Sequence, residues 1–145
     1  MSVRENIAAN LLSVISNISS PDIKKATRQP FQLDELSDKQ YPAVIVQTSE
    51  ENRDDSELGT GARTRHGTID FVVLGFVKGA ESNIDTARNA LITAIESAIE
   101  TDITRDSNAL DSEVVQVETD EGSLFPVGGI KMTIRCMYEY QSGTP

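Results

Sequence analysis

The sequence predicts an α+β fold in which two amphipathic helices pack on one face of an antiparallel or mixed sheet of about four strands, in the order α-β-β-α-β-β. Two observations lead to this prediction. Apolar side chains recur at helical spacing in residues 3–18 and 84–99, whereas residues 43–77 and 113–141 contain pairs of β-branched or alternating runs. With 145 residues, 38% of them hydrophobic, the chain can build one core, so we expect a single domain over residues 1–145.

The first predicted helix begins at the N-terminus and ends before Pro21. Ser2 followed by Glu5 predicts a capping box, and Pro21 cannot continue a helix. The apolar positions that define the dry face of this helix are Val3, Ile7, Leu11, Val14 and Ile18.

The next segments predict a hairpin with a large polar tip. Residues 23–40 favour a short edge strand followed by a loop, and residues 43–47 form a β-branched run typical of a buried strand. Residues 49–61 are rich in carboxylates and end on Gly59-Thr60-Gly61, so we expect a mobile, charged loop. A long strand then follows over residues 63–77.

The second half repeats the pattern of one helix and two strands. Asn83 and Asp85 favour a helix start, and Ile84, Leu91, Ile95 and Ile99 lie on one helical face. A polar loop over 102–112 leads to a short strand near 113–118. The final strand alternates, with Ile130, Met132, Ile134, Cys136, Tyr138 and Tyr140 on one predicted face.

Composition excludes several classes of function. Thirteen Lys and Arg against 23 Asp and Glu give a net charge of −10, which disfavours sequence-specific binding to nucleic acid. No stretch approaches the roughly 18 to 20 apolar residues that span a bilayer, so we expect a soluble protein with no membrane partner. A single Cys and a single His leave little material for zinc sites or catalytic pairs, so we expect neither a cofactor nor an enzyme.

Two segments resemble ligand-binding loops only weakly. Asp102, Thr104, Asp106, Asn108 and Glu113 have the offsets of a calcium loop, but Ser107 stands where the sharp turn needs glycine. Residues 59–61 lack the Gly-Lys-Ser/Thr ending of a phosphate loop. We therefore interpret the first as a polar loop that ends a helix, and the second as a flexible connection.

The charged segment 49–66 is the strongest candidate for function, because a long polar arm on a small core is suited to contact with another subunit. The predicted interaction residues in this arm are Glu50, Glu51, Arg53, Asp54, Asp55, Glu57, Arg63, Arg65 and His66.

The order of these segments resembles that of the tail terminator, or tail completion, proteins of long-tailed bacteriophages. The resemblance lies in the N-terminal helix beginning near Arg4, the core strand Tyr41-Pro42-Ala43-Val44-Ile45-Val46, the charged hairpin, the second helix, a loop bearing Asp102, the turn Thr119-Asp120-Glu121-Gly122, and the last strand ending Tyr138-Glu139-Tyr140. It spans nearly the whole chain.

The resemblance implies a homohexameric ring that caps the tail tube, stops its polymerisation and docks the head. The implied partners are further copies of the chain, the tail tube protein and the head-tail connector or neck proteins. DNA would pass non-specifically through an acidic channel. The location would be the tail or neck of a virion assembled in the host bacterial cytoplasm.

Ring closure needs two different patches that bind each other. The basic residues Lys24, Lys25 and Arg28 and the acidic segments 50–57 or 111–121 are candidates. Two alternatives stay open: a head-completion or neck connector protein of the same kind of virion, and a small ligand-binding or hydrolytic domain.

Overall fold

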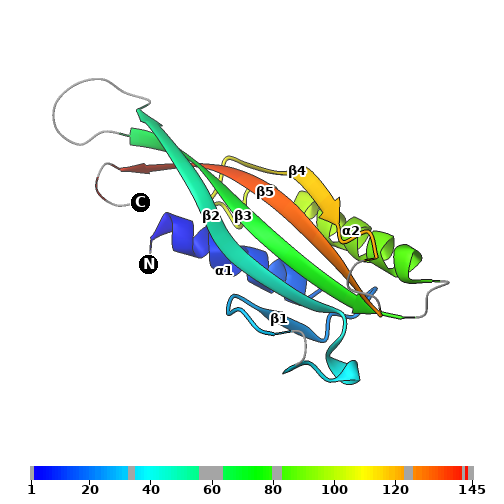
Figure 1. The fold of residues 1–145 in the computed structure, drawn as a ribbon. Helices are drawn as coiled ribbons and strands as arrows, with labels where there is room; N and C mark the ends of the chain where they lie inside the picture. The colour runs from blue at the N-terminus through cyan, green and yellow to red at the C-terminus, as the bar shows by residue number, and fades with distance from the viewer. Residues whose placement is uncertain are drawn as a thin grey trace.

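Five strands form one mixed sheet, and two helices cover one of its faces (Figure 1). In a computed structural model of the chain, the structure describes residues 2–32, 35–55, 64–79, 83–122, 126–141 and 143. The elements are α1 (Val3–Ser16), β1 (Lys25–Thr27), the 3-10 helix η2 (Asp38–Gln40), β2 (Ala43–Asp55), β3 (Thr64–Lys78), α2 (Ile84–Thr101), β4 (Asp111–Thr119) and β5 (Val127–Gln141). The predicted α+β class is confirmed.

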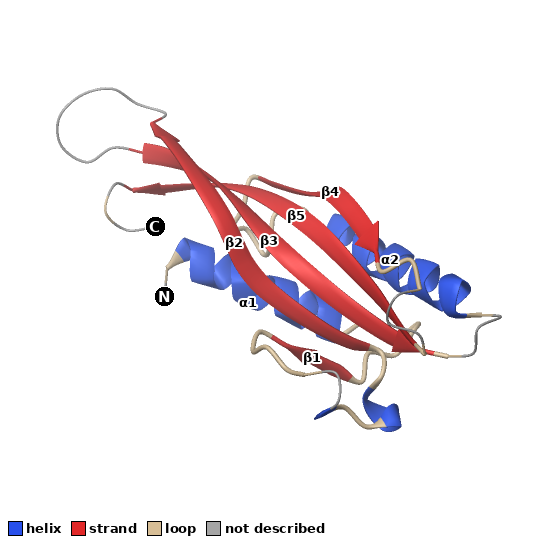
Figure 2. Ribbon diagram, in the orientation of Figure 1, coloured by secondary structure: helices blue, strands red, loops and turns tan. Residues whose placement is uncertain are grey.

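The strand order is β1-β2-β3-β5-β4, so β1 and β4 are the two edges. β1 runs parallel to β2, and the other neighbours are antiparallel. β1 is the short edge strand expected within residues 23–40. Both helices lie on the same side of the sheet, as Figure 2 shows, with α1 against β1 and β2 and with α2 against β3, β4 and β5. We call this side the helix face and the other side the open face.

The core lies between the sheet and the helices. Phe71 of β3, Ile134 of β5, Leu11 of α1 and Ile95 of α2 are all fully buried there. Burying each such side chain contributes about 1.5–3 kcal/mol relative to leaving it exposed. At Gly75 an added Cβ would lie 2.8 Å from Leu91 Cδ2, so the absent side chain lets α2 approach β3 closely. The predicted dry faces of the second helix and of the last strand are confirmed. The prediction for α1 is correct at Ile7 and Leu11, but Ile15 takes the buried position instead of Val14, and α1 ends at Ser16, before Ile18.

The start of α1 is only partly the predicted capping box. The Glu5 backbone N–H donates to the Ser2 hydroxyl oxygen at 3.2 Å, as expected. The Glu5 carboxylate, however, pairs with the Arg28 guanidinium, with Arg28 Nη2 donating to Oε2 at 3.2 Å. This hydrogen-bonded pairing lowers the pKa of Glu5. A charged partner on the neighbouring segment therefore holds the side chain that would have closed the box.

A buried arginine completes the end of α2. Arg105 is fully buried, and its Nη2 donates to the backbone carbonyls of Ile99 and Asp102. Burial lowers the pKa of its guanidinium. The Asp102 carboxylate accepts from the backbone N–H groups of Thr104 and Asp106, at 3.0 and 2.9 Å. These bonds fit the polar, helix-ending loop that we predicted for this segment.

The expectation of a loop over residues 49–61 is wrong for its first half. β2 continues to Asp55 and pairs with β3 as far as Asp55 opposite Arg65. Residues 56–63 lie outside the described part of the chain. The charged side chains misled the prediction, because a ribbon that extends beyond the core needs no apolar face while its backbone groups bond across the ladder.

Candidate assembly surface

The charged end of the sheet is a three-stranded ribbon. We call it the arm and define it as residues 51–55 of β2, 64–69 of β3 and 136–141 of β5, which pair in register. Its outer end lies beyond both helices (Figure 1). The outer end of the arm therefore presents backbone and side chains that the helices do not cover.

A bulge in β2 sets which residues face inward at the base of the arm. The register shifts between Thr48, opposite Phe71, and Glu51, opposite Ile69. Thr48 and Phe71 share the helix face, as do Glu51 and Ile69, so the shift moves the inward positions of β2 from even to odd numbers. Arg53, opposite Gly67, follows Glu51 onto this face.

Glu51 is the centre of a polar cluster at the base of the arm. The Tyr138 hydroxyl donates to Glu51 Oε1 at 2.9 Å, Arg4 Nε lies 3.4 Å from the same oxygen, and Arg53 Nε pairs with Oε2. The Glu51 side chain is only 8% exposed, whereas Arg4 and Arg53 remain 40% and 34% exposed. One mostly buried carboxylate thus connects the N-terminal turn of α1 to β2 and β5.

Two tyrosines fill the space beneath these charges. The rings of Tyr138 and Tyr140 have centroids 5.5 Å apart, and the Arg53 guanidinium lies 5.1 Å from the Tyr140 ring centroid. At Gly67 an added Cβ would lie 2.5 Å from Tyr138 Cε1, so only glycine lets this ring lie across β3. Burial and the bond to Glu51 raise the pKa of Tyr138 to about 12.

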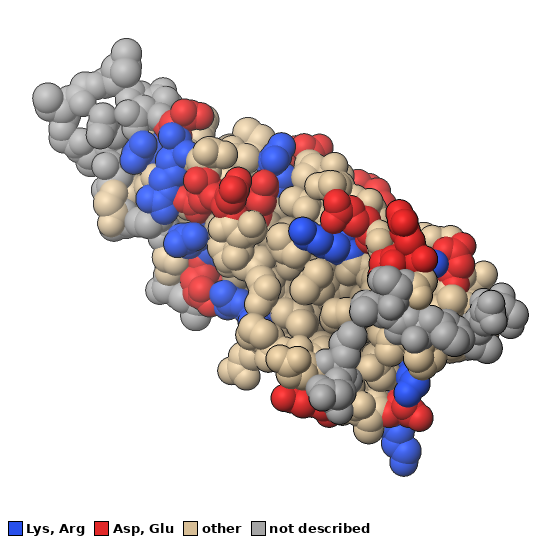
Figure 3. All heavy atoms as spheres, viewed as in Figure 1, with Lys and Arg blue, Asp and Glu red and all other residues tan. Residues whose placement is uncertain are grey.

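The open face of the arm and of the sheet beside it carries a second set of polar contacts. His66 Nε2 lies 2.8 Å from Glu139 Oε1, and closer to the core Arg135 binds both oxygens of Asp70, at 2.9 and 3.2 Å. Figure 3 shows acidic and basic side chains side by side towards the arm, and mostly uncharged side chains over the middle of this view. The arm therefore offers neighbouring positive and negative groups rather than a field of one sign.

The structure divides the predicted arm residues between several environments. Glu51, Arg53 and Arg65 lie on the helix face of the arm, while His66 lies on the open face and Glu50 and Asp54 are exposed. Asp55 ends β2, and Glu57 and Arg63 are outside the described residues.

The predicted basic cluster does not form one patch. Lys24 pairs with Asp22 at 2.7 Å, the Lys25 ammonium lies 5.4 Å from the Phe31 ring centroid, and Arg28 is held by Glu5. These residues nevertheless share one place in the fold, because they lie within or directly beside β1, the edge strand next to β2.

Sequence reasoning missed two members of the Glu51 cluster, Arg4 and Tyr138, and the neighbouring Tyr140. The tyrosines were predicted to lie on the buried face of the last strand, but nothing in one sequence pairs a tyrosine with a carboxylate 87 residues away. The available signal was Gly67 inside an alternating strand, since such a glycine often marks close approach of another group.

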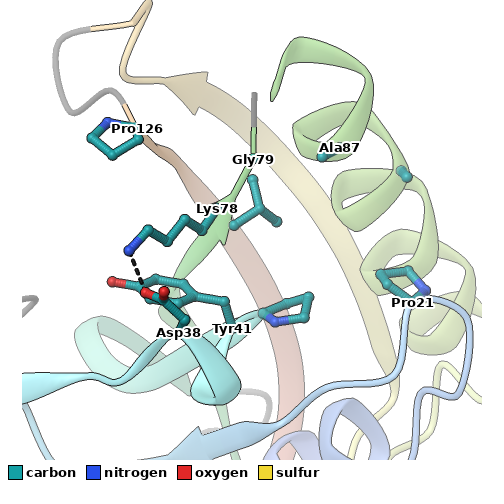
Figure 4. A pocket seen from close by; sticks show the side chains of 10 residues that line it. Pro21, Asp38, Tyr41, Lys78, Gly79, Ala87 and Pro126 are labelled. Carbon is teal, nitrogen blue, oxygen red and sulfur yellow. Dashed lines mark hydrogen bonds and ion pairs between the residues drawn. The ribbon is translucent and has the colours of Figure 1, made fainter. Parts of the chain in front are cut away.

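One pocket, at the opposite end of the sheet from the arm, is a candidate for the ligand-binding alternative. It has a volume of about 510 Å³, and its lining includes Pro21, Tyr41 and Pro126. Figure 4 shows Lys78 and Asp38 paired with each other at this pocket, and the bond to Asp38 raises the pKa of Lys78. Lys78 and Asp38 therefore neutralise each other at this pocket.

Within the described residues, no three His, Cys, Asp or Glu gather to hold a metal ion, and no helix is both long and apolar enough to cross a bilayer.

Comparisons with known proteins give a structural similarity alone. No family model matches the sequence, and no curated protein matches it. Among solved structures, the fold is similar to a chain described as "Virion of native gene transfer agent (GTA) particle", with a TM-score of 0.48, 16% identity, and coverage of 96% of this chain and 92% of that chain. At this level of similarity, the function has to be argued from the residues themselves.

Proposed function

We propose that this protein is a structural component of a phage-type virion, and specifically a tail terminator. Copies of the chain would form a ring, with six as the expected number, that caps the tail tube, ends its polymerisation and provides the surface to which the head connector docks. The order of its segments resembles that of the tail terminator family, and this resemblance is the reason for proposing a tail terminator in particular.

The observation that carries the proposal is the construction of the arm. Three strands extend past the helices, and the Glu51 cluster fixes their base to α1 through Arg4. A charged ribbon fixed at its base can reach a neighbouring molecule without losing much conformational entropy on binding. We therefore assign the arm to contacts with the tail tube or with adjacent copies in the ring.

The net charge of −10 supports the same role. A protein that surrounds DNA during its passage must not hold the phosphates, and an acidic molecule releases no counterions from DNA because it neutralises none of its charges. DNA would thus be a passing cargo, and the lasting partners would be proteins.

Shortening the arm tests the proposal. Replacing residues 54–66 by Asn-Gly, a dipeptide suited to a two-residue hairpin turn, removes the outer part of the arm in β2 and β3 and leaves Arg53 and Gly67 to close the ladder. This change retains the Glu51 cluster, which a deletion of residues 50–61 would destroy. We expect the circular dichroism spectrum and Tm of the native protein, together with loss of binding to purified tails.

Electron microscopy of the native protein mixed with purified tails, and separately with purified heads, provides the readout. Rings on tail ends support a terminator, whereas rings only on heads identify a head-completion protein. Full tail binding by the shortened variant would show that the arm has been given the wrong role.

A further inference from the structure

The β4 edge of the sheet has the features of an unfilled strand-pairing surface. In the described part of the chain, β4 has a neighbouring strand on one side only, which is β5. An edge strand presents unpaired backbone groups that another strand can bind.

Apolar exposure is concentrated at this edge. Val115 and Val117 of β4 are 39% and 42% exposed, and Leu110, directly before β4, is 51% exposed. The other large hydrophobic side chains exposed among the described residues are Ile103, whose carbonyl accepts from Ser112 of β4, and Met137, opposite Asp111. Leu110, Val115 and Val117 therefore offer apolar side chains for contact with another protein beside the free strand edge.

The negative charge of the β4 edge indicates which kind of strand can pair with it. β4 carries Asp111, Glu113 and Glu118 and no Lys or Arg. Arg135 and Lys131 of β5 lie opposite Glu113 and Glu118, and Arg135 is shared with Asp70. A second β4 would set carboxylates against carboxylates, which disfavours pairing between two identical edges.

The opposite edge of the same sheet has the complementary charge. β1 and its flanking residues include the basic side chains of Lys24, Lys25 and Arg28. Lys24 is exposed and pairs with the exposed Asp22, while Lys25 is half-buried beside Phe31. An ion pair on the surface typically stabilises a protein by less than about 1 kcal/mol. Lys24 can therefore leave Asp22 for a carboxylate of another molecule at little cost.

We propose that the β4 edge of one copy binds the β1 edge of the next copy, so that the sheet continues from subunit to subunit. Val115 and Val117 supply the apolar contact, and the opposite charges fix which edges meet. Because two different edges of one molecule join, the contact is heterologous and can close into a ring. This inference adds a specific contact to the proposed function, and it rests on the self-association into a ring that the proposed function includes.

Charge reversal at each edge tests the contact. The acidic-edge variant Glu113→Lys/Glu118→Lys and the basic-edge variant Lys24→Glu/Lys25→Glu each set like charges against each other in a self-assembly. We expect the dissociation constant of self-association to rise by a factor on the order of 10 to 100 in each variant, measured by size exclusion with light scattering. Mixing the two variants restores complementary edges and should restore assembly.

The matched control is Glu96→Lys/Glu100→Lys, which makes the same change in net charge on the exposed side of α2. It should assemble like the native protein. If the acidic-edge variant does not fold, Val117→Lys alters one partly exposed side chain of the same edge and should also block assembly.

The outcomes separate this inference from the proposed function. Native-like assembly of both edge variants, or no recovery on mixing, would overturn the edge-to-edge contact while leaving tail binding by the native protein intact. A native protein that stays monomeric with or without tails would overturn both.

Discussion

Removing the Tyr138 hydroxyl is the most direct perturbation of the arm. Tyr138 is fully buried and donates to a Glu51 carboxylate that is 8% exposed. A hydrogen bond to a charged group contributes about 1.5–3 kcal/mol, and loss of a neutral one costs about 0.5–1.5 kcal/mol. We therefore expect Tyr138→Phe to lower the free energy of unfolding by about 1.5–3 kcal/mol.

A double-mutant cycle isolates this bond. Glu51→Gln keeps the shape of the acceptor but removes its charge, so Tyr138→Phe should cost about 1 kcal/mol less in that background than in the native chain. The assay is equilibrium urea unfolding at neutral pH, followed by circular dichroism.

Tyr140 provides the matched control. It is also buried, but its hydroxyl has no hydrogen-bond partner among the described residues. Tyr140→Phe should therefore leave the free energy of unfolding unchanged within about 0.5 kcal/mol. The reasoning would be refuted if the two tyrosine variants lost equal stability, or if the Tyr138 and Glu51 effects were additive.

Three further predictions concern Gly67, Tyr138 and Cys136. Gly67→Ala should cost about 1–3 kcal/mol of unfolding free energy, measured by urea unfolding, because its Cβ would lie 2.5 Å from the Tyr138 ring. The Tyr138 phenol should titrate near pH 12 in the difference between native and Tyr138→Phe absorbance spectra. Because this folded pKa lies above the usual 10, its contribution of about 2–3 kcal/mol is complete below pH 10 and is lost as the pH rises towards 12. The Cys136 thiol is buried and its pKa is raised by burial, so it should react with a thiol reagent only as fast as the protein unfolds.

The elements with one buried face could be predicted from sequence. In α2, Leu91, Ile95 and Ile99 recur at the helical period, and β5 alternates from Ile130 to Tyr140, because burial on one side imposes those periods. Over residues 51–55 the inward side chains, Glu51 and Arg53, are charged and contact tyrosines, so no apolar period marks this part of the strand and the pattern favoured a loop.

The candidate site could be predicted only as a segment. Charge and length identified the arm, but Glu51 becomes central only through Tyr138 and Arg4, which are distant in sequence. Arg105 was overlooked for a related reason, since arginine is rarely fully buried and its role at the end of α2 depends on carbonyls fixed by the tertiary structure.

The bulge in β2 has a consequence for comparing relatives of this chain. It accommodates one surplus residue between Thr48 and Glu51, so a homologue lacking Ser49 could run straight through and still place its glutamate opposite Ile69. A one-residue gap in an alignment is therefore expected there. The same gap between Glu51 and Asp55 would move the side chains of the outer ribbon to the opposite face of the sheet. Alignments should therefore place length variation before the glutamate and keep the spacing constant after it.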